Sequence, residues 1–166
     1  MTLADAASRA DELAASGNEK ELAQLRLQWA DELEGAARSA DYRTRATAYR
    51  AIGQFRFRQK QELLARGLED ESPACRGSAL ISLELLSREH PGVLNSQRPL
   101  LHRMVASEEE NLAVRRLAAM CLKNGSPQQD TITLLKGLSD DDELDGELRR
   151  SAGKVAESLR KRAPKR

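Results

Sequence analysis

A repeated pattern is clearest in the stretch Asn111-Leu112-Ala113-Val114-Arg115-Arg116-Leu117-Ala118. A polar residue suited to capping a helix is followed four positions later by an arginine, and three positions after the arginine comes an alanine. The four arginines that recur in this way are separated by 31, 39 and 34 residues, the length of a two-helix repeat rather than of a coiled-coil heptad. The sequence therefore predicts an internal helical repeat. The other three copies are Asp41/Arg45/Ala48, Ser72/Arg76/Ala79 and Asp145/Arg149/Ala152.

Each copy of the pattern is expected to begin a helix with one buried face. Asp, Ser and Asn are the side chains that best cap the free amides of a helix N-terminus. Three positions in each copy lie about one turn apart: the residue before the arginine, the alanine, and the residue four positions after that alanine. These positions are Thr44/Ala48/Ile52, Cys75/Ala79/Leu83, Val114/Ala118/Leu122 and Leu148/Ala152/Ala156.

A second helix is expected after each of the first three copies. Apolar pairs four residues apart mark it, and the middle pair begins six residues later than the other two when measured from its arginine. We assign the six extra residues to a loop at residues 88–92, because Pro-Gly commonly marks a turn. The three pairs are Leu64/Leu68, Leu101/Val105 and Leu134/Leu138.

This combination of residues resembles the first helix of a HEAT repeat. Val114-Arg115-Arg116-Leu117-Ala118-Ala119 shows it most completely and is similar to the short bacterial repeats related to phycobilisome-lyase subunits. The resemblance covers residues 41–160 and implies a right-handed α-solenoid. In that family the arginine pairs with an acid of a neighbouring turn, and Asp70 and Asp140 suit this role. The resemblance thus implies structural roles for the arginines of all four copies: Arg45, Arg76, Arg115 and Arg149.

Length and composition favour one all-α domain over the whole chain, residues 1–166. Only 3% of the residues are aromatic, and the β-branched and aromatic residues typical of strands are scarce. We predict about four HEAT-like two-helix units, the last of them incomplete. The predicted parts are a capping hairpin (1–40), repeats at 41–71, 72–110 and 111–144, a terminal helix (145–162) and a basic tail (163–166).

The N-terminal hairpin lacks the arginine pattern and is interpreted as a divergent end unit. Leu22, Leu25, Trp29 and Leu33 would line one side of its second helix. Terminal units of solenoids are atypical because they must cover the end of the apolar core. Trp29 is the only tryptophan, and we favour a core anchor over a residue that stacks on a ligand.

Several classes of function receive no support from the sequence. The formal net charge of +1 does not indicate a nucleic-acid or membrane partner, and no apolar run approaches the ~20 residues of a membrane span. No secretory signal is recognisable, and Cys75 and Cys121 fit reduced core residues, so a cytoplasmic location is expected. We find no phosphate-binding loop and no catalytic or metal-binding motif, which predicts a protein without metal, cofactor or enzymatic activity. The resemblance alone leaves open a chromophore-lyase subunit or a DNA-base glycosylase.

The leading hypothesis is a protein–protein interaction scaffold or adaptor, because stacked helical units expose an extended face. Two residues after the leucine that defines each second helix the chain places a cation: Arg66, then Arg103, then Lys136. Stacked helices lie roughly 8–10 Å apart, so we expect a short positive row that binds an acidic partner protein. Arg98 and His102 would broaden this row. The competing interpretation is that each cation only complements the dipole at a helix C-terminus.

Nucleic-acid binding is the alternative function. It would use the second-helix cations together with the basic end of the chain, Arg160-Lys161-Arg162-Ala163-Pro164-Lys165-Arg166. No aromatic residues are interleaved with these charges for base stacking, so we favour a solvated helix end.

Overall fold

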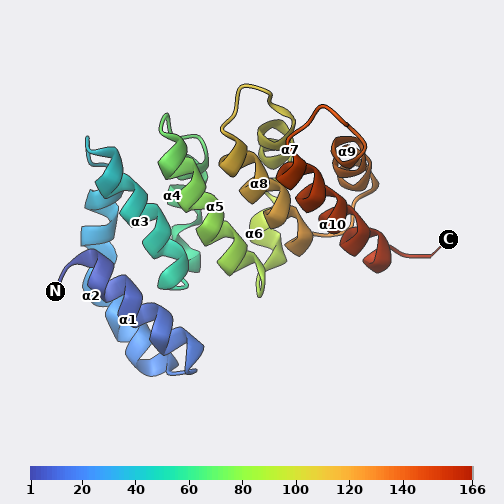
Figure 1. Cartoon of the computed structure of the whole chain (residues 1–166). Helices are drawn as coiled ribbons and strands as arrows, with labels where there is room; N and C mark the ends of the chain where they lie inside the picture. Colours follow the sequence, from blue (N-terminus) through green and yellow to red (C-terminus); the bar gives the residue numbers. More distant parts are fainter. Residues whose placement is uncertain (166) are drawn as a thin grey trace. The chain divides into compact units, whose positions relative to one another are not determined.

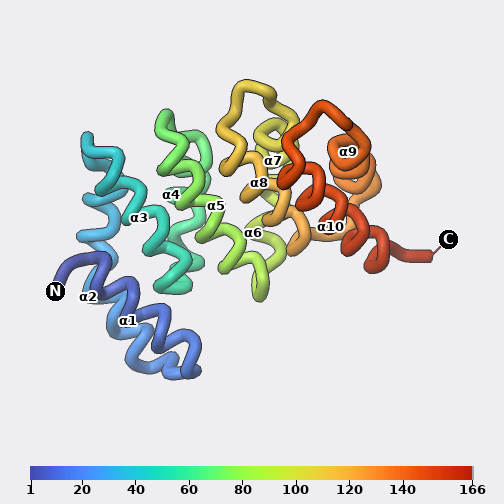
Figure 2. Tube along the Cα trace, in the orientation of Figure 1, coloured from blue at the N-terminus to red at the C-terminus, as the bar shows by residue number. Residues whose placement is uncertain are grey.

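The structure, a computed structural model, describes residues 1–165 and is built from helices. Ten α-helices and two short 3-10 helices account for all its regular elements, and the described residues contain no strand, which confirms the all-α prediction. The helices follow one another along the chain in Figures 1 and 2. Internal contacts divide the chain into an N-terminal unit, Met1–Leu86, and a C-terminal unit, Ser87–Arg166. The single domain and its solenoid arrangement stay predictions.

The N-terminal unit contains five helices, and the first three start at a residue whose side chain caps them. Thr2 and Asp5 form a capping box at the start of the first helix, Asn18 caps the second, and Asp41 caps the third. Gly17 follows the first helix with φ 73°, a left-handed conformation that glycine adopts at little cost. The helices are α1 (Leu3–Ala15), α2 (Glu19–Ala37), α3 (Tyr42–Gln54), α4 (Gln61–Leu68) and α5 (Pro73–Ser87), and the 3-10 helix Arg58–Lys60 precedes α4.

The predicted N-terminal hairpin is formed by α1 and α2, which pack against each other and against α3 (Figure 1). Leu22, Trp29 and Leu33 are buried as expected, whereas Leu25 lies at the edge of this face and is half-buried. Trp29 is 7% exposed, as expected of a core anchor.

Deleting residues 1–40 is expected to destabilise what remains. Both hairpin helices cover α3, so the truncated chain would expose apolar surface that is buried in the full protein. We expect aggregation in size-exclusion chromatography and a broad thermal transition. A truncated chain that is monomeric and melts as sharply as the full chain would rule out this role.

Helices α3 and α5 approach each other closely where Gly53 meets Ser82. Ser82 is fully buried on α5, and its Oγ accepts a hydrogen bond from the Gly53 amide at 2.9 Å and donates to the Tyr49 carbonyl. A Cβ at Gly53 would lie 2.7 Å from the Ser82 Cα, so the two helices approach too closely for any larger residue. The absence of a side chain at Gly53 therefore allows this packing.

The predicted buried stripe of the pattern helices is present with one exception. In α3, Ala48 and Ile52 are fully buried, but Thr44 is exposed. Thr44 lies in the first turn of α3, where no helix of the unit covers it closely enough to bury it. The prediction for Thr44 was therefore wrong, and the other stripe positions are buried: Cys75, Ala79, Leu83, Val114, Ala118, Leu122, Leu148, Ala152 and Ala156.

The C-terminal unit is arranged around α10, which packs against α8 and α9. Its pattern helices start as predicted, because Asn111 accepts hydrogen bonds from two amides of the first turn of α8 and Asp145 caps α10. The elements are α6 (Pro91–Asn95), α7 (Arg98–Ala106), α8 (Leu112–Cys121), the 3-10 helix Leu122–Asn124, α9 (Gln129–Ser139) and α10 (Gly146–Arg162).

Two predictions about the second helices need correction. Residues 88–92 are not simply a loop, because Pro91 begins the short helix α6, and repeat 72–110 therefore contains three helices rather than two. In α9 the buried face is formed by Ile132 and Leu135, while Leu134 and Leu138 are half-buried. The apolar residues of α9 form two neighbouring stripes. The stripe with Ile132 and Leu135 is buried in the helix that packs against α10, and the stripe with Leu134 and Leu138 is not.

Candidate interaction site

The first of the pattern arginines forms a two-pronged ion pair with an acid. Arg45 Nε and Nη2 donate to the two carboxylate oxygens of Asp70 at 2.9 and 3.0 Å, and the side chains are only 12% and 7% exposed. This is the pairing that the family resemblance implied for Asp70. Burial alone would raise the pKa of Asp70, but hydrogen bonds from Arg45 and from the Ser72 amide offset it and lower the pKa.

The lowered pKa of Asp70 predicts that acid destabilises the N-terminal unit. The unfolded chain, in which Asp70 titrates near its ordinary pKa of about 3.9, binds the proton more readily, so this contribution is present above about pH 4 and is lost as the pH falls through the folded pKa. Urea unfolding between pH 6 and pH 2.5 should show this loss. The Asp70→Asn variant should be less stable at pH 6 and less sensitive to acid. If the variant and the unmodified protein lost stability equally at low pH, Asp70 would not be the source of the acid sensitivity.

All four pattern arginines also bind backbone carbonyls at or just after the end of the preceding helix. Carbonyls at the end of a helix and in the turn after it have no partner in the helical hydrogen-bond pattern, and a guanidinium satisfies them while complementing the helix dipole. The carbonyls are those of Ser39 and Ala40 for Arg45, Asp70 and Glu71 for Arg76, Val105 for Arg115, and Ser139 for Arg149. These contacts support the structural role that the sequence predicts.

The acid partner varies among the copies. Arg149 Nη2 pairs with Asp142 at 3.1 Å, not with the predicted Asp140. Asp140 is the C-cap residue of α9, and its carboxylate lies 4.0 Å from Lys136 on the same helix. Arg115 is 4% exposed, and its Nε donates to the Val105 carbonyl at 3.0 Å. The backbone contact is thus the feature common to the four copies.

The predicted row of second-helix cations stays a prediction for Arg66 and Arg103 and fails for Lys136. Arg66 on α4 and Arg103 on α7 are exposed, and they belong to different units. Each follows a buried leucine by two residues, whereas Lys136 follows the buried Leu135 by one. One residue corresponds to about 100° around a helix, so Lys136 points in a different direction relative to its buried face. The position of α9 that corresponds to Arg103 is Gly137. The prediction that Lys136 occupies the same position in its helix as Arg66 and Arg103 was therefore wrong.

Arg98 and His102 are occupied by internal contacts. Arg98 Nη2 donates to Ser126 Oγ at 2.7 Å and also contacts the Asn95 side chain. His102 Nε2 lies 2.8 Å from Oγ1 of the buried Thr131, and burial lowers the pKa of His102. These two side chains connect parts of the C-terminal unit and are poorly placed to contact a partner.

The basic end of α10 also makes internal contacts. Arg160 forms an ion pair with Glu157 at 2.7 Å, and Arg162 donates to the Gly125 carbonyl at 2.9 Å. Lys161 lies 3.9 Å from Glu157. Arg166, the last residue of the predicted tail, lies outside the described residues. The contacts at this end stabilise the terminal turn of α10 and balance part of its charge.

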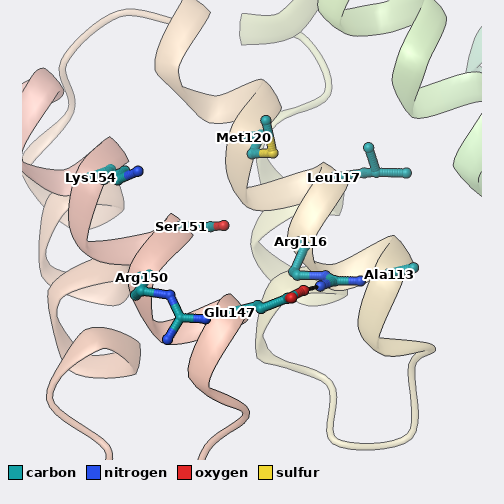
Figure 3. Close-up of a pocket in the computed structure, with 8 residues that line it drawn as sticks. All are labelled: Ala113, Arg116, Leu117, Met120, Glu147, Arg150, Ser151 and Lys154. Atoms are coloured by element: carbon teal, nitrogen blue, oxygen red, sulfur yellow. Dashed lines mark ion pairs between the residues drawn. The ribbon is translucent and has the colours of Figure 1, made fainter.

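A groove between α8 and α10 has a different character (Figure 3). It has a volume of about 580 Å³ and is lined on the α8 side by Ala113, Leu117 and Met120 together with Arg116. Arg116 forms an ion pair with Glu147, which joins the two helices at one end of the groove. We call this feature the α8–α10 groove; its α10 side is formed by Glu147, Arg150, Ser151 and Lys154.

The α8–α10 groove combines apolar surface with positive charge that has no internal partner. Met120 is 41% exposed, which is unusual for a large apolar side chain. Arg150 and Lys154 are exposed, and neither forms an ion pair with a described residue. Since Glu147 balances Arg116, the groove carries two uncompensated positive charges beside an apolar patch.

The sequence contains a signal for this groove, although it is a weak one. Ala113, Arg116, Leu117 and Met120 follow the i, i+3, i+4, i+7 spacing of one helix face, and the α10 residues of the groove follow the same spacing. Within the pattern helices these faces lie beside the buried stripe, and only the contact between α8 and α10 turns them toward a common space.

We also searched the described residues for a metal site and for a membrane-spanning helix. Residues 1–165 contain no cluster of three or more His, Cys, Asp or Glu residues placed to hold a metal ion, and none of their helices is long and apolar enough to cross a bilayer. Comparison with known proteins found no matching family model and no matching curated protein sequence.

Proposed function

We propose that the protein is a non-catalytic interaction module that binds an acidic segment of a partner protein in the α8–α10 groove. The observation that carries this proposal is the pair of uncompensated cations, Arg150 and Lys154, beside the exposed side chain of Met120. An amphipathic segment could place carboxylates against the two cations and an apolar side chain against Met120 and Ala113. Charge complementarity of this kind provides specificity and accelerates association.

The same proposal includes an α-solenoid of HEAT-like units as the scaffold. It is supported by the recurrence of one contact, from each pattern arginine to the carbonyls at the end of the preceding helix. Repeated units of this kind hold their surface side chains in fixed positions, which suits recognition without rearrangement. The proposed docking surface lies on α8 and α10, which are pattern helices, rather than on the second helices.

The proposal can be tested with a photo-crosslinking amino acid at position 120. The crosslinked partner is identified and purified, and its affinity is measured for the unmodified protein and for the Arg150→Glu/Lys154→Glu variant. We expect at least a tenfold loss, which corresponds to about 1.4 kcal/mol, and an affinity that falls as salt is raised. The matched control is Arg103→Glu/Lys136→Glu, which reverses two exposed cations on α7 and α9.

The outcomes separate the competing surfaces and functions. Loss of binding in the control variant but not in the groove variant would locate the partner on the second helices instead. Salt-dependent binding of duplex DNA that requires Arg160 and Lys161 would favour the nucleic-acid function. Either result would overturn docking in the α8–α10 groove.

A further inference from the structure

A separate cavity lies in the N-terminal unit and is bordered by α1, α3 and α5. It has a volume of about 340 Å³, and five of the seven residues that line it have polar or charged side chains. Thr47, Arg50 and Gln54 lie along one face of α3, because they are three and four residues apart. Ser8 of α1 and Ser78 of α5 complete the polar lining, and the small Ala4 and Ala46 leave the space open.

Arg50 is the unusual residue of this cavity. Its Nη1 is buried without a hydrogen-bond partner, and no carboxylate of the described residues lies within 4.0 Å of its guanidinium. Burial lowers the pKa of Arg50, the charge of Asp11 opposes this effect, and Arg56 adds to it. Asp11 is engaged elsewhere, because Arg56 Nη1 binds it at 2.8 Å. The positive charge of Arg50 is therefore partly desolvated and has no counter-ion in contact.

The neighbours of Arg50 are able to donate hydrogen bonds. The side chains of Ser8, Gln54 and Ser78 form no hydrogen bond with the described residues and border the same space. Hydroxyl and amide groups of this kind donate to an oxyanion. Thr47 is different, because its hydroxyl donates to the Arg43 carbonyl at 3.1 Å and can only accept from a ligand.

We infer that this cavity binds a small carboxylate, with Arg50 as the charged partner and Ser8, Gln54 and Ser78 as additional donors. A desolvated charge without a partner destabilises a protein, and a bound anion would remove this cost through a charge-assisted hydrogen bond. One uncompensated guanidinium matches the single charge of a carboxylate. A phosphate carries more than one negative charge at pH 7 and would leave an excess of negative charge near Asp11. This inference is independent of the proposed docking groove, which uses residues of the other unit.

The test is a nuclear magnetic resonance titration of the ¹⁵N-labelled full chain at constant ionic strength. Sodium acetate should cause saturable shifts at the Arg50 Nε–Hε and Ser78 amide signals, and sodium chloride should not. Inorganic phosphate should bind at least several-fold more weakly than acetate. N-acetylglycine, which mimics a peptide C-terminus, separates the two sources of carboxylate: tighter binding than acetate would indicate a peptide and weaker binding a free small acid.

Two variants make the test specific. Arg50→Gln should weaken acetate binding at least tenfold without lowering the melting temperature, because it removes an unpaired charge. Arg43→Gln is the matched control, since Arg43 is exposed on the same helix, and it should bind acetate like the unmodified protein. Absence of saturable shifts, or equal acetate affinity in the Arg50→Gln variant, would overturn the site. Tighter binding of phosphate than of acetate would overturn its assignment to carboxylates.

Discussion

Replacing Arg115 with alanine is expected to lower the free energy of unfolding by about 1.5–3 kcal/mol, the contribution typical of a hydrogen bond to a charged group. Arg115 is 4% exposed, and its Nε satisfies the Val105 carbonyl in the last turn of α7. The truncation would leave that carbonyl without its partner and remove the packing of the arginine stem between α7 and α8. Urea unfolding followed by circular dichroism measures the effect directly.

The control for this prediction is Arg103→Ala. Arg103 lies on α7, two residues before Val105, but its side chain is exposed. Its loss should therefore change stability by less than about 0.5 kcal/mol. If Arg115→Ala left the denaturation midpoint unchanged while partner binding was lost, the arginine would belong to a binding site and its structural role would be refuted.

Replacing Gly53 with alanine is expected to destabilise the N-terminal unit by about 1–3 kcal/mol, the range found for overpacked cores. The added methyl group would meet the backbone of Ser82 at 2.7 Å, and a backbone atom cannot move aside as the end of a flexible side chain can. Separating α3 from α5 would also weaken the hydrogen bond from the Gly53 amide to Ser82 Oγ. Thermal melting and urea unfolding both report this change.

Gly35→Ala is a control that is expected to raise the free energy of unfolding rather than lower it. Gly35 lies within α2, and a methyl group there would meet nothing within 4 Å. Alanine restricts the unfolded chain and favours the helix, so this variant should be more stable by about 0.5–1 kcal/mol. Equal effects of the two substitutions would show that close packing of α3 on α5 does not determine the response at Gly53.

Features that depend on neighbours along the chain were predictable from the sequence. The helix starts at Asp41, Asn111 and Asp145 follow from capping, in which a side chain binds an amide two or three residues away. The buried stripe of the pattern helices follows from the 3.6-residue period. The pairing of Arg45 with Asp70 was implied by the family resemblance, and the arrangement of the repeats as a solenoid stays a prediction.

Other predictions failed where the sequence allows two local arrangements. Either apolar face of α9 could have been buried, and contact with α10 selected Leu135 over Leu134. Pro91 suits a turn as well as the first position of a helix, and here it begins α6. Arg149 could reach several acids after α9, and it pairs with Asp142 rather than Asp140. The surrounding fold determines which of these arrangements forms, and no pattern in the sequence predicts it.

Residue types and helix periodicity, then, were enough to specify the all-helical class, the caps of α3, α8 and α10, and most of the buried stripe of the pattern helices. Both candidate sites depend instead on side chains from separate helices. Arg150 and Lys154 face the apolar residues of α8 only because α10 packs beside it, and the sequence contains enough acids that either cation could have been paired. Arg50 likewise differs from the paired arginines only in what surrounds it. Whether a charge meets a counter-ion is determined by distances across the fold, since the interaction between two charges depends on their separation in space and on the solvent around them.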